Sequence, residues 1–181
     1  PSPFYRANEL RDYYNELTLR FKKDWNVEFR AYNDGIAYRF VSRSKKPFNV
    51  VDETVDYRFP SDMVASVPYV KAGKDGDYES QYFNSFENTY TTDRLSKLNK
   101  KRLMFLPLVV DAGEGVKICI TESGLENYPG LYLSAAEGEK RLTGQFAPYP
   151  KKTVQGGHNQ LQMLVKEREA YIAKVDNPRS F

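Results

Sequence analysis

The stretch VEFRAYNDGIAYRF, residues 27–40, decides the fold. On each side of Asn33-Asp34-Gly35, apolar side chains occupy every second position. Alternation with a period of two is typical of a strand that turns one face toward a core. Asn and Gly accept the positive φ angles that tight hairpin turns require. The stretch therefore predicts an antiparallel β-hairpin.

Similar strand signals occur on both sides of this hairpin. Residues 17–21 alternate before it, and residues 116–120 alternate after a predicted hairpin loop at 111–115. Residues 104–110 form a continuous apolar run, which predicts a buried strand, although Pro107 within it indicates an edge position or a bulge. Frequent hairpin signals with little helix predict an all-β sandwich.

Two segments read less clearly. Residues 92–99 predict a short helix, with Thr92 as its cap and Leu95 and Leu98 on one face. The composition of residues 160–175 favours a helix, but their apolar positions also fit the alternation of a strand. We find no internal repeat and no linker rich enough to divide the chain, so residues 1–181 are predicted to form a single domain.

The composition excludes several classes of protein. The 27 basic residues are balanced by 24 acidic ones, and a net charge of +3 gives no footprint for a nucleic-acid partner. No apolar run reaches the length of a membrane span. Cys119 has no cysteine partner in the chain and lies between two isoleucines, which predicts a buried or half-buried thiol. Because the chain begins at Pro1 rather than Met, we expect a processed protein or an excised segment.

Residues with catalytic chemistry are few. His158 is the only histidine, so neither a Ser-His-Asp triad nor a histidine-rich metal cluster is supported, and no catalytic residue is assigned. Four carboxylates surround the 111–115 loop and the turn after residue 120: Asp111, Glu114, Glu122 and Glu126. Calcium prefers such oxygen ligands, but the spacing is not that of an EF-hand loop. From local sequence alone, Glu122 is a solvated turn residue.

Aromatic residues make up 14% of the chain. Tyr128, Tyr132, Phe146 and Tyr149 are candidates for stacking against a sugar ring on one face of the sandwich. Packing within the core or at a sheet edge is the alternative explanation for each of them.

Several sequence blocks together resemble one family, the N-terminal domain of glycoside hydrolase family 97. They are residues 29–40 (FRAYNDGIAYRF), 106–111 (LPLVVD), 120–133 (ITESGLENYPGLYL), 171–173 (YIA) and 179–181 (RSF). The blocks occur in order and span most of the chain, and the Thr-Glu pair followed by Tyr-Pro-Gly is the most specific of them.

The resemblance implies a β-super-sandwich of the galactose mutarotase-like kind, incomplete at its N-terminal side because the family domain is longer. It favours a strand for residues 160–175. The parent enzymes are calcium-dependent α-glucosidases and α-galactosidases of Bacteroides-type bacteria, and their catalytic carboxylates lie in a following (β/α)₈ barrel. By its motif, Glu122 is the residue that the N-terminal domain contributes as a calcium ligand.

Further expectations follow from the same resemblance. The partners are the catalytic barrel of the same parent chain and the α-linked oligosaccharide substrate of the parent, and the location is periplasmic or secreted. This segment alone is expected to be inactive, since it lacks the barrel. Two alternatives from other classes stay open, a free-standing carbohydrate-binding module and a structural sandwich of the cell envelope. The sequence does not separate an α-glucosidase from an α-galactosidase.

Overall fold

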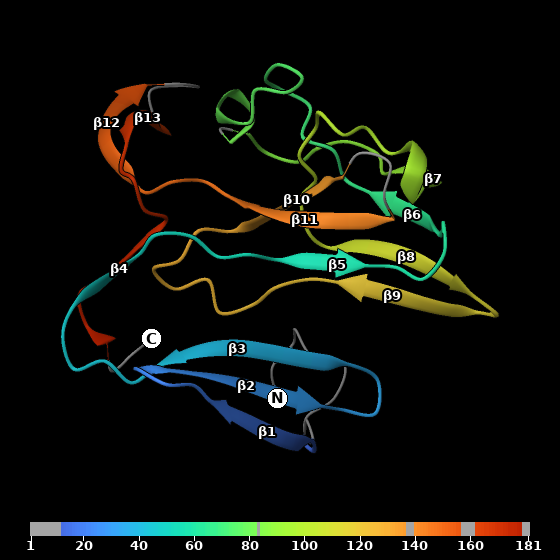
Figure 1. Ribbon diagram of the computed structural model, residues 1–181. Helices are drawn as coiled ribbons and strands as arrows, with labels where there is room; N and C mark the ends of the chain where they lie inside the picture. The colour runs from blue at the N-terminus through green and yellow to red at the C-terminus, as the bar shows by residue number, and fades with distance from the viewer. Residues whose placement is uncertain (1–11, 83, 137–139, 157–161, 179–181) are drawn as a thin grey trace, which may run out of the picture. The chain divides into compact units, whose positions relative to one another are not determined.

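The computed structural model describes residues 12–82, 84–136, 140–156 and 162–178. The chain divides into two compact units, one formed by Pro1–Phe48 with Val175–Phe181 and the other by Asn49–Lys174. Within the described ranges the regular structure consists of strands and two short 3₁₀ helices, with no α-helix (Figure 1). The all-β prediction is confirmed, while the single domain over residues 1–181 stays a prediction. No helix in the described part is long and apolar enough to cross a membrane.

The first unit contains the hairpin that was predicted for residues 27–40. Strands β1 (Asn15–Arg20), β2 (Trp25–Ala31) and β3 (Ile36–Ser42) form an antiparallel sheet in the order β1-β2-β3. The register pairs Ala31 with Ile36, and the Tyr32 N–H donates to the Gly35 carbonyl at 2.8 Å, which closes the turn. The predicted hairpin is therefore confirmed.

The period-two pattern gives this sheet two unlike faces. One face carries the apolar side chains Leu17, Leu19, Val27, Phe29, Tyr38 and Phe40, which lie opposite one another in the strand register. The other face carries the cross-strand ion pairs Arg30–Glu16 at 3.0 Å and Arg39–Glu28 at 2.7 Å. Val27 is buried, but Leu17 is 57% exposed. The alternation thus predicted the strands correctly, whereas the burial of the apolar face is only partial.

Among the described residues, three antiparallel sheets lie wholly within the second unit. A four-stranded sheet has the order β7-β6-β8-β9, a three-stranded sheet has the order β10-β11-β5, and β12 pairs with β13. Their bounds are β5 (Asp56–Arg58), β6 (Val64–Val67), β7 (Thr91–Arg94), β8 (Leu108–Gly113), β9 (Val116–Ile120), β10 (Leu131–Ala135), β11 (Arg141–Phe146), β12 (Pro150–Gly156) and β13 (Gln162–Arg168). The 3₁₀ helices are η1 (Glu79–Gln81) and η2 (Leu95–Lys97), and the short strands β4 (Phe48–Val50) and β14 (Ala173–Val175) pair with each other.

One hydrophobic core joins the two larger sheets of this unit. The four-stranded sheet contributes Val67, Leu108 and Val110, all fully buried. The three-stranded sheet contributes Leu133 and Leu142, which are also fully buried and belong to the same cluster. Two antiparallel sheets that share one core form a sandwich, so the predicted architecture is confirmed.

The structure corrects three local predictions. The predicted helix at 92–99 is wrong, because Thr91–Arg94 pair with β6 as strand β7 and only the 3₁₀ helix η2 follows. The apolar run at 104–110 is not one strand, since Met104 lies in isolated bridges to Tyr69 and Leu133 and β8 begins only at Leu108. Cys119 is exposed rather than buried. For 160–175 the strand prediction is confirmed within the described residues by β13 and β14.

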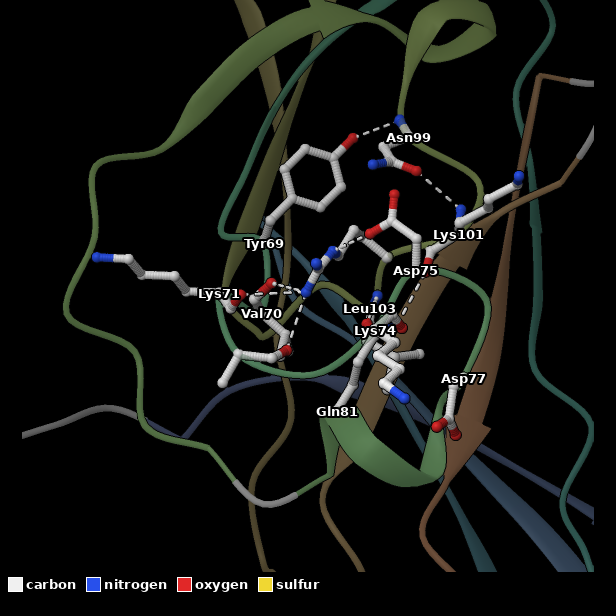
Figure 2. A network of polar contacts seen from close by, with 12 residues as sticks. Tyr69, Val70, Lys71, Lys74, Asp75, Asp77, Gln81, Asn99, Lys101 and Leu103 are labelled. Atoms are coloured by element: carbon white, nitrogen blue, oxygen red, sulfur yellow. Dashed lines mark hydrogen bonds and ion pairs between the residues drawn. The ribbon is translucent and has the colours of Figure 1, made fainter.

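A buried glutamine holds together the loops that follow β6 and η2. The Gln81 side chain, fully buried at the end of η1, donates from Nε2 to the carbonyls of Lys74 at 2.8 Å and Lys101 at 2.9 Å. Its Oε1 accepts the Leu103 N–H at 2.8 Å. Figure 2 shows Gln81 rising from η1 toward Leu103, with Lys74 beside it. The Leu103 N–H therefore depends on this side chain for its hydrogen bond, whereas the Lys74 and Lys101 carbonyls also accept the N–H groups of Asp77 and Gly76.

Gly144 in β11 gives a prediction for the stability of the sandwich. A Cβ at Gly144 would lie 2.6 Å from the Val55 Cβ and 3.0 Å from the Leu131 Cδ1. Overpacking of a dense core costs about 1–3 kcal/mol, so we expect Gly144→Ala to lower the free energy of unfolding by that amount in chemical denaturation. Gly35→Ala is the control, because Gly35 does not have the positive φ angle that the sequence predicted for this turn, and a Cβ there meets nothing within 4 Å. Equal stability of the two variants would contradict the packing described here.

Candidate functional site

Glu122 lies two residues after the end of β9 and is held by the start of β10. Both of its carboxylate oxygens accept the N–H of Leu131, Oε1 at 2.9 Å and Oε2 at 3.0 Å. The side chain is half-buried, and the prediction of a solvated turn residue is therefore wrong. A single N–H shared by both oxygens fixes the direction of the carboxylate, and each oxygen keeps a further lone pair for another ligand.

The turn between Glu122 and Leu131 passes close to this carboxylate. A Cβ on Gly130 would meet Glu122 Oε1 at 3.5 Å, which is ordinary contact distance. Within the turn, Gly124 and Asn127 have positive φ angles of 70° and 58°. Asn tolerates that conformation better than most residues, and Gly adopts it freely. The Pro-Gly corner thus brings the chain back so that β10 begins against Glu122.

A second carboxylate lies near enough to act on the charge of Glu122. Burial raises the pKa of the Glu122 carboxyl, the hydrogen bond from the Leu131 N–H lowers it, and the negative charge of Glu53 raises it further. The net direction is upward. Since like charges disfavour each other's ionised forms, a cation at this turn would relieve the repulsion between the two carboxylates.

Glu53 is a member of this site that the sequence did not indicate. The Tyr128 O–H donates to Glu53 Oε2 at 2.7 Å, across 75 residues of chain. Burial, together with the hydrogen bond and charge of Glu53, raises the pKa of Tyr128, so its hydroxyl stays a donor. The only sequence signal was the acidic run VDETVD at 51–56, which has no spacing that points to residues 122–131.

The other candidate carboxylates do not join Glu122. Asp111 pairs with Lys117 and accepts the Gly113 N–H at 3.0 Å, within the β8–β9 hairpin. Glu114 occupies the tip of that hairpin with φ of 50°, and Glu126 is exposed in the turn before β10. Within the described ranges, no group of three or more His, Cys, Asp or Glu residues could hold a metal ion. His158 lies outside the described residues.

Each of the four aromatic candidates contacts at least one other aromatic ring. Tyr128 meets Phe146 edge-to-face, with ring centroids 5.9 Å apart, and Tyr149 stacks on Tyr171 at 5.6 Å. Tyr132 contacts the rings of Tyr82 and Phe105. Within unit 2 these rings therefore serve packing, which is the alternative that the sequence left open.

A calcium ion takes six to eight oxygen ligands, and the donors here supply a small part of that set. Glu122 offers a half-buried carboxylate with a fixed direction and free lone pairs, which fits the chemistry of a single contributed ligand. The acids of the described residues do not complete a site. The fold and the site thus define a class, an all-β domain that presents one oriented carboxylate at the end of a strand.

Comparison with known proteins identifies the family. A model of the glycosyl-hydrolase 97 N-terminal family matches residues 2–169, and the chain belongs to this family. Over all 181 of its residues the chain is 82% identical to a retaining alpha-galactosidase of Bacteroides thetaiotaomicron. It spans 27% of the length of that relative.

Proposed function

We propose that this chain is the N-terminal domain of a retaining α-galactosidase. The observation that supports this most strongly is the 82% identity over the whole chain to a protein of that name. The chain covers 27% of that protein, and the expected catalytic barrel would occupy part of the rest. The domain would brace that barrel, and the substrate would be an α-linked galactoside. A free-standing binding module is less favoured, because the whole chain matches one part of a much longer enzyme.

In this proposal, Glu122 is the one ligand that the domain gives to a calcium ion at the active site. The clamp by Leu131 supports the role, because a carboxylate held by the first residue of a strand is positioned more precisely than one on a free loop. The other ligands would come from the barrel and from water. Bound there, the ion would orient the sugar and polarise an oxygen near the bond that breaks.

The location of the parent protein is proposed as periplasmic or secreted. This rests on the family resemblance. Immunodetection of the parent protein in separated periplasmic, culture and cytoplasmic fractions of the producing cells tests it directly.

The activity itself is tested with the full-length protein. We expect it to hydrolyse an aryl α-galactoside at least about tenfold faster than the matching α-glucoside. The two sugars are epimers that differ in the orientation of one hydroxyl, and a site that hydrogen-bonds this hydroxyl in one orientation discriminates strongly against the other. Proton NMR of the first product should show the α-anomer. Removal of calcium with a chelator should abolish turnover, and added calcium should restore it. Preference for the glucoside, or full activity after chelation, would contradict the proposal.

A further inference from the structure

We propose that Glu53 and Tyr128 form a positioning pair for the Glu122 carboxylate, so that Glu53 contributes to calcium binding without touching the ion. The inference rests on the proposed function of Glu122. It assigns a role to two residues that lie 75 positions apart in the chain and whose side chains meet at 2.7 Å.

The first step is the anchoring of Tyr128. Its ring is half-buried, packs against the core cluster and meets Phe146 edge-to-face at 5.9 Å. The hydroxyl points to Glu53, which is itself half-buried and directly precedes the segment that leads into β5. Tyr128 is therefore fixed at both ends, at the ring by the core and at the hydroxyl by a charged acceptor. Hydrogen bonds to a charged acceptor are stronger than those between neutral groups.

The second step links Tyr128 to Glu122. Tyr128-Pro129-Gly130 leads directly into Leu131, the residue whose N–H holds both oxygens of Glu122. Leu131 is 9% exposed and pairs with Phe146 in the β10–β11 register. The three-residue corner thus has one end on the Glu53 carboxylate and the other on β11. Loss of the Glu53 bond removes one restraint on the first end, while the packing of the Tyr128 ring remains, and the donor that orients Glu122 then has a wider range of positions.

A direct ionic role for Glu53 is the alternative. Glu53 lines a surface pocket of about 360 Å³ together with Asp52, Asp56 and Arg141, so other charged side chains lie at the same pocket. The two roles differ in what Glu53 must supply. Positioning needs a hydrogen-bond acceptor for the Tyr128 hydroxyl, which a glutamine oxygen also provides, whereas direct attraction of the ion needs the negative charge.

The test uses the full-length protein and calcium chloride, with calorimetry as the readout of calcium affinity. Tyr128→Phe and Glu53→Ala should each weaken calcium binding about tenfold or more, the usual effect of losing a partner that orients a metal ligand. Glu53→Gln should restore most of the affinity, because it keeps the acceptor. Thermal unfolding in the presence of a chelator measures how much each substitution changes the stability of the calcium-free protein. That change can then be separated from the change in calcium affinity.

Tyr69→Phe is the matched control. Tyr69 is also a half-buried tyrosine packed against the same core cluster, and its hydroxyl accepts the Asn99 N–H at 2.7 Å. It should lose stability to a similar degree and keep its calcium affinity. Unchanged calcium affinity in Tyr128→Phe and Glu53→Ala would overturn the pair, as would a Glu53→Gln variant as weak as Glu53→Ala. Glu122→Gln in the same titration distinguishes a failure of this inference from a failure of the proposed function. If Glu122→Gln also binds calcium with normal affinity, the proposed function fails together with this inference.

Discussion

Glu122→Gln in the full-length protein is expected to weaken calcium binding by on the order of 100-fold and to lower kcat with it. Partners that only orient a metal ligand already contribute 10–100-fold, and a ligand contributes at least as much. Glutamine has nearly the same shape, and its oxygen can still accept the Leu131 N–H that now holds both carboxylate oxygens. The variant therefore removes the charge and leaves the turn in place. Calorimetry with calcium and steady-state kinetics give the two numbers.

The control for this variant is Glu126→Gln. Glu126 is an exposed acid in the same turn, four residues beyond Glu122. Its substitution changes the net charge of the protein equally, and calcium affinity and kcat should stay as in the unaltered protein. If Glu122→Gln behaved like this control, Glu122 would have no part in holding the ion.

Gln81→Leu is the substitution with the largest expected effect on stability. It removes the acceptor for the Leu103 N–H and the donor for the carbonyls of Lys74 and Lys101, all at a side chain that is 0% exposed. The Leu103 N–H, left buried without its acceptor, costs about 1–3 kcal/mol, and each of the two lost hydrogen bonds to the carbonyls costs about 0.5–1.5 kcal/mol, because Asp77 and Gly76 still donate to them. A total loss of about 3 kcal/mol is therefore expected. Chemical denaturation of the chain measures the free energy of unfolding.

Amide hydrogen exchange tests the same prediction at a single residue, Leu103. The Leu103 amide should exchange faster in Gln81→Leu by more than the global loss of stability explains, because it has lost its own acceptor. Glu87→Leu is the control, since Glu87 is exposed in the loop before β7. It should change stability by no more than about 0.5 kcal/mol. If the Gln81→Leu variant were as stable as this control, water would be replacing the hydrogen bonds of the Gln81 side chain with no loss in the free energy of unfolding.

The elements that sequence reasoning predicted correctly are those set by neighbouring residues. The 27–40 hairpin depends on its own alternation and on Asn33-Asp34-Gly35, and its register follows from them. The wrong predictions arose where pairing with a distant segment decided the outcome. Residues 92–99 have a helix-like pattern, but residues 91–94 pair with β6 at the edge of the sheet and so form a strand. Cys119 lies in the outer strand β9, where alternation does not ensure burial.

The site shows the same limit. Glu122 was singled out by its motif in a family block, and local sequence alone gave a solvated turn residue. The clamp by Leu131 depends on the β10–β11 register, which no pattern near residue 122 reveals. Glu53 could not be found at all, because its contact with Tyr128 joins segments 75 residues apart. Gln81 escaped notice for a similar reason, since its three backbone partners lie in two segments that meet only in the fold.

The central claim is that this domain donates the Glu122 carboxylate to a calcium ion in the parent enzyme. The most direct test is a crystal structure of the full-length protein with calcium, in which anomalous scattering locates the ion. We predict an oxygen of Glu122 about 2.3–2.6 Å from it, the usual range for calcium and oxygen. An ion with a complete set of ligands that excludes Glu122 would contradict the account.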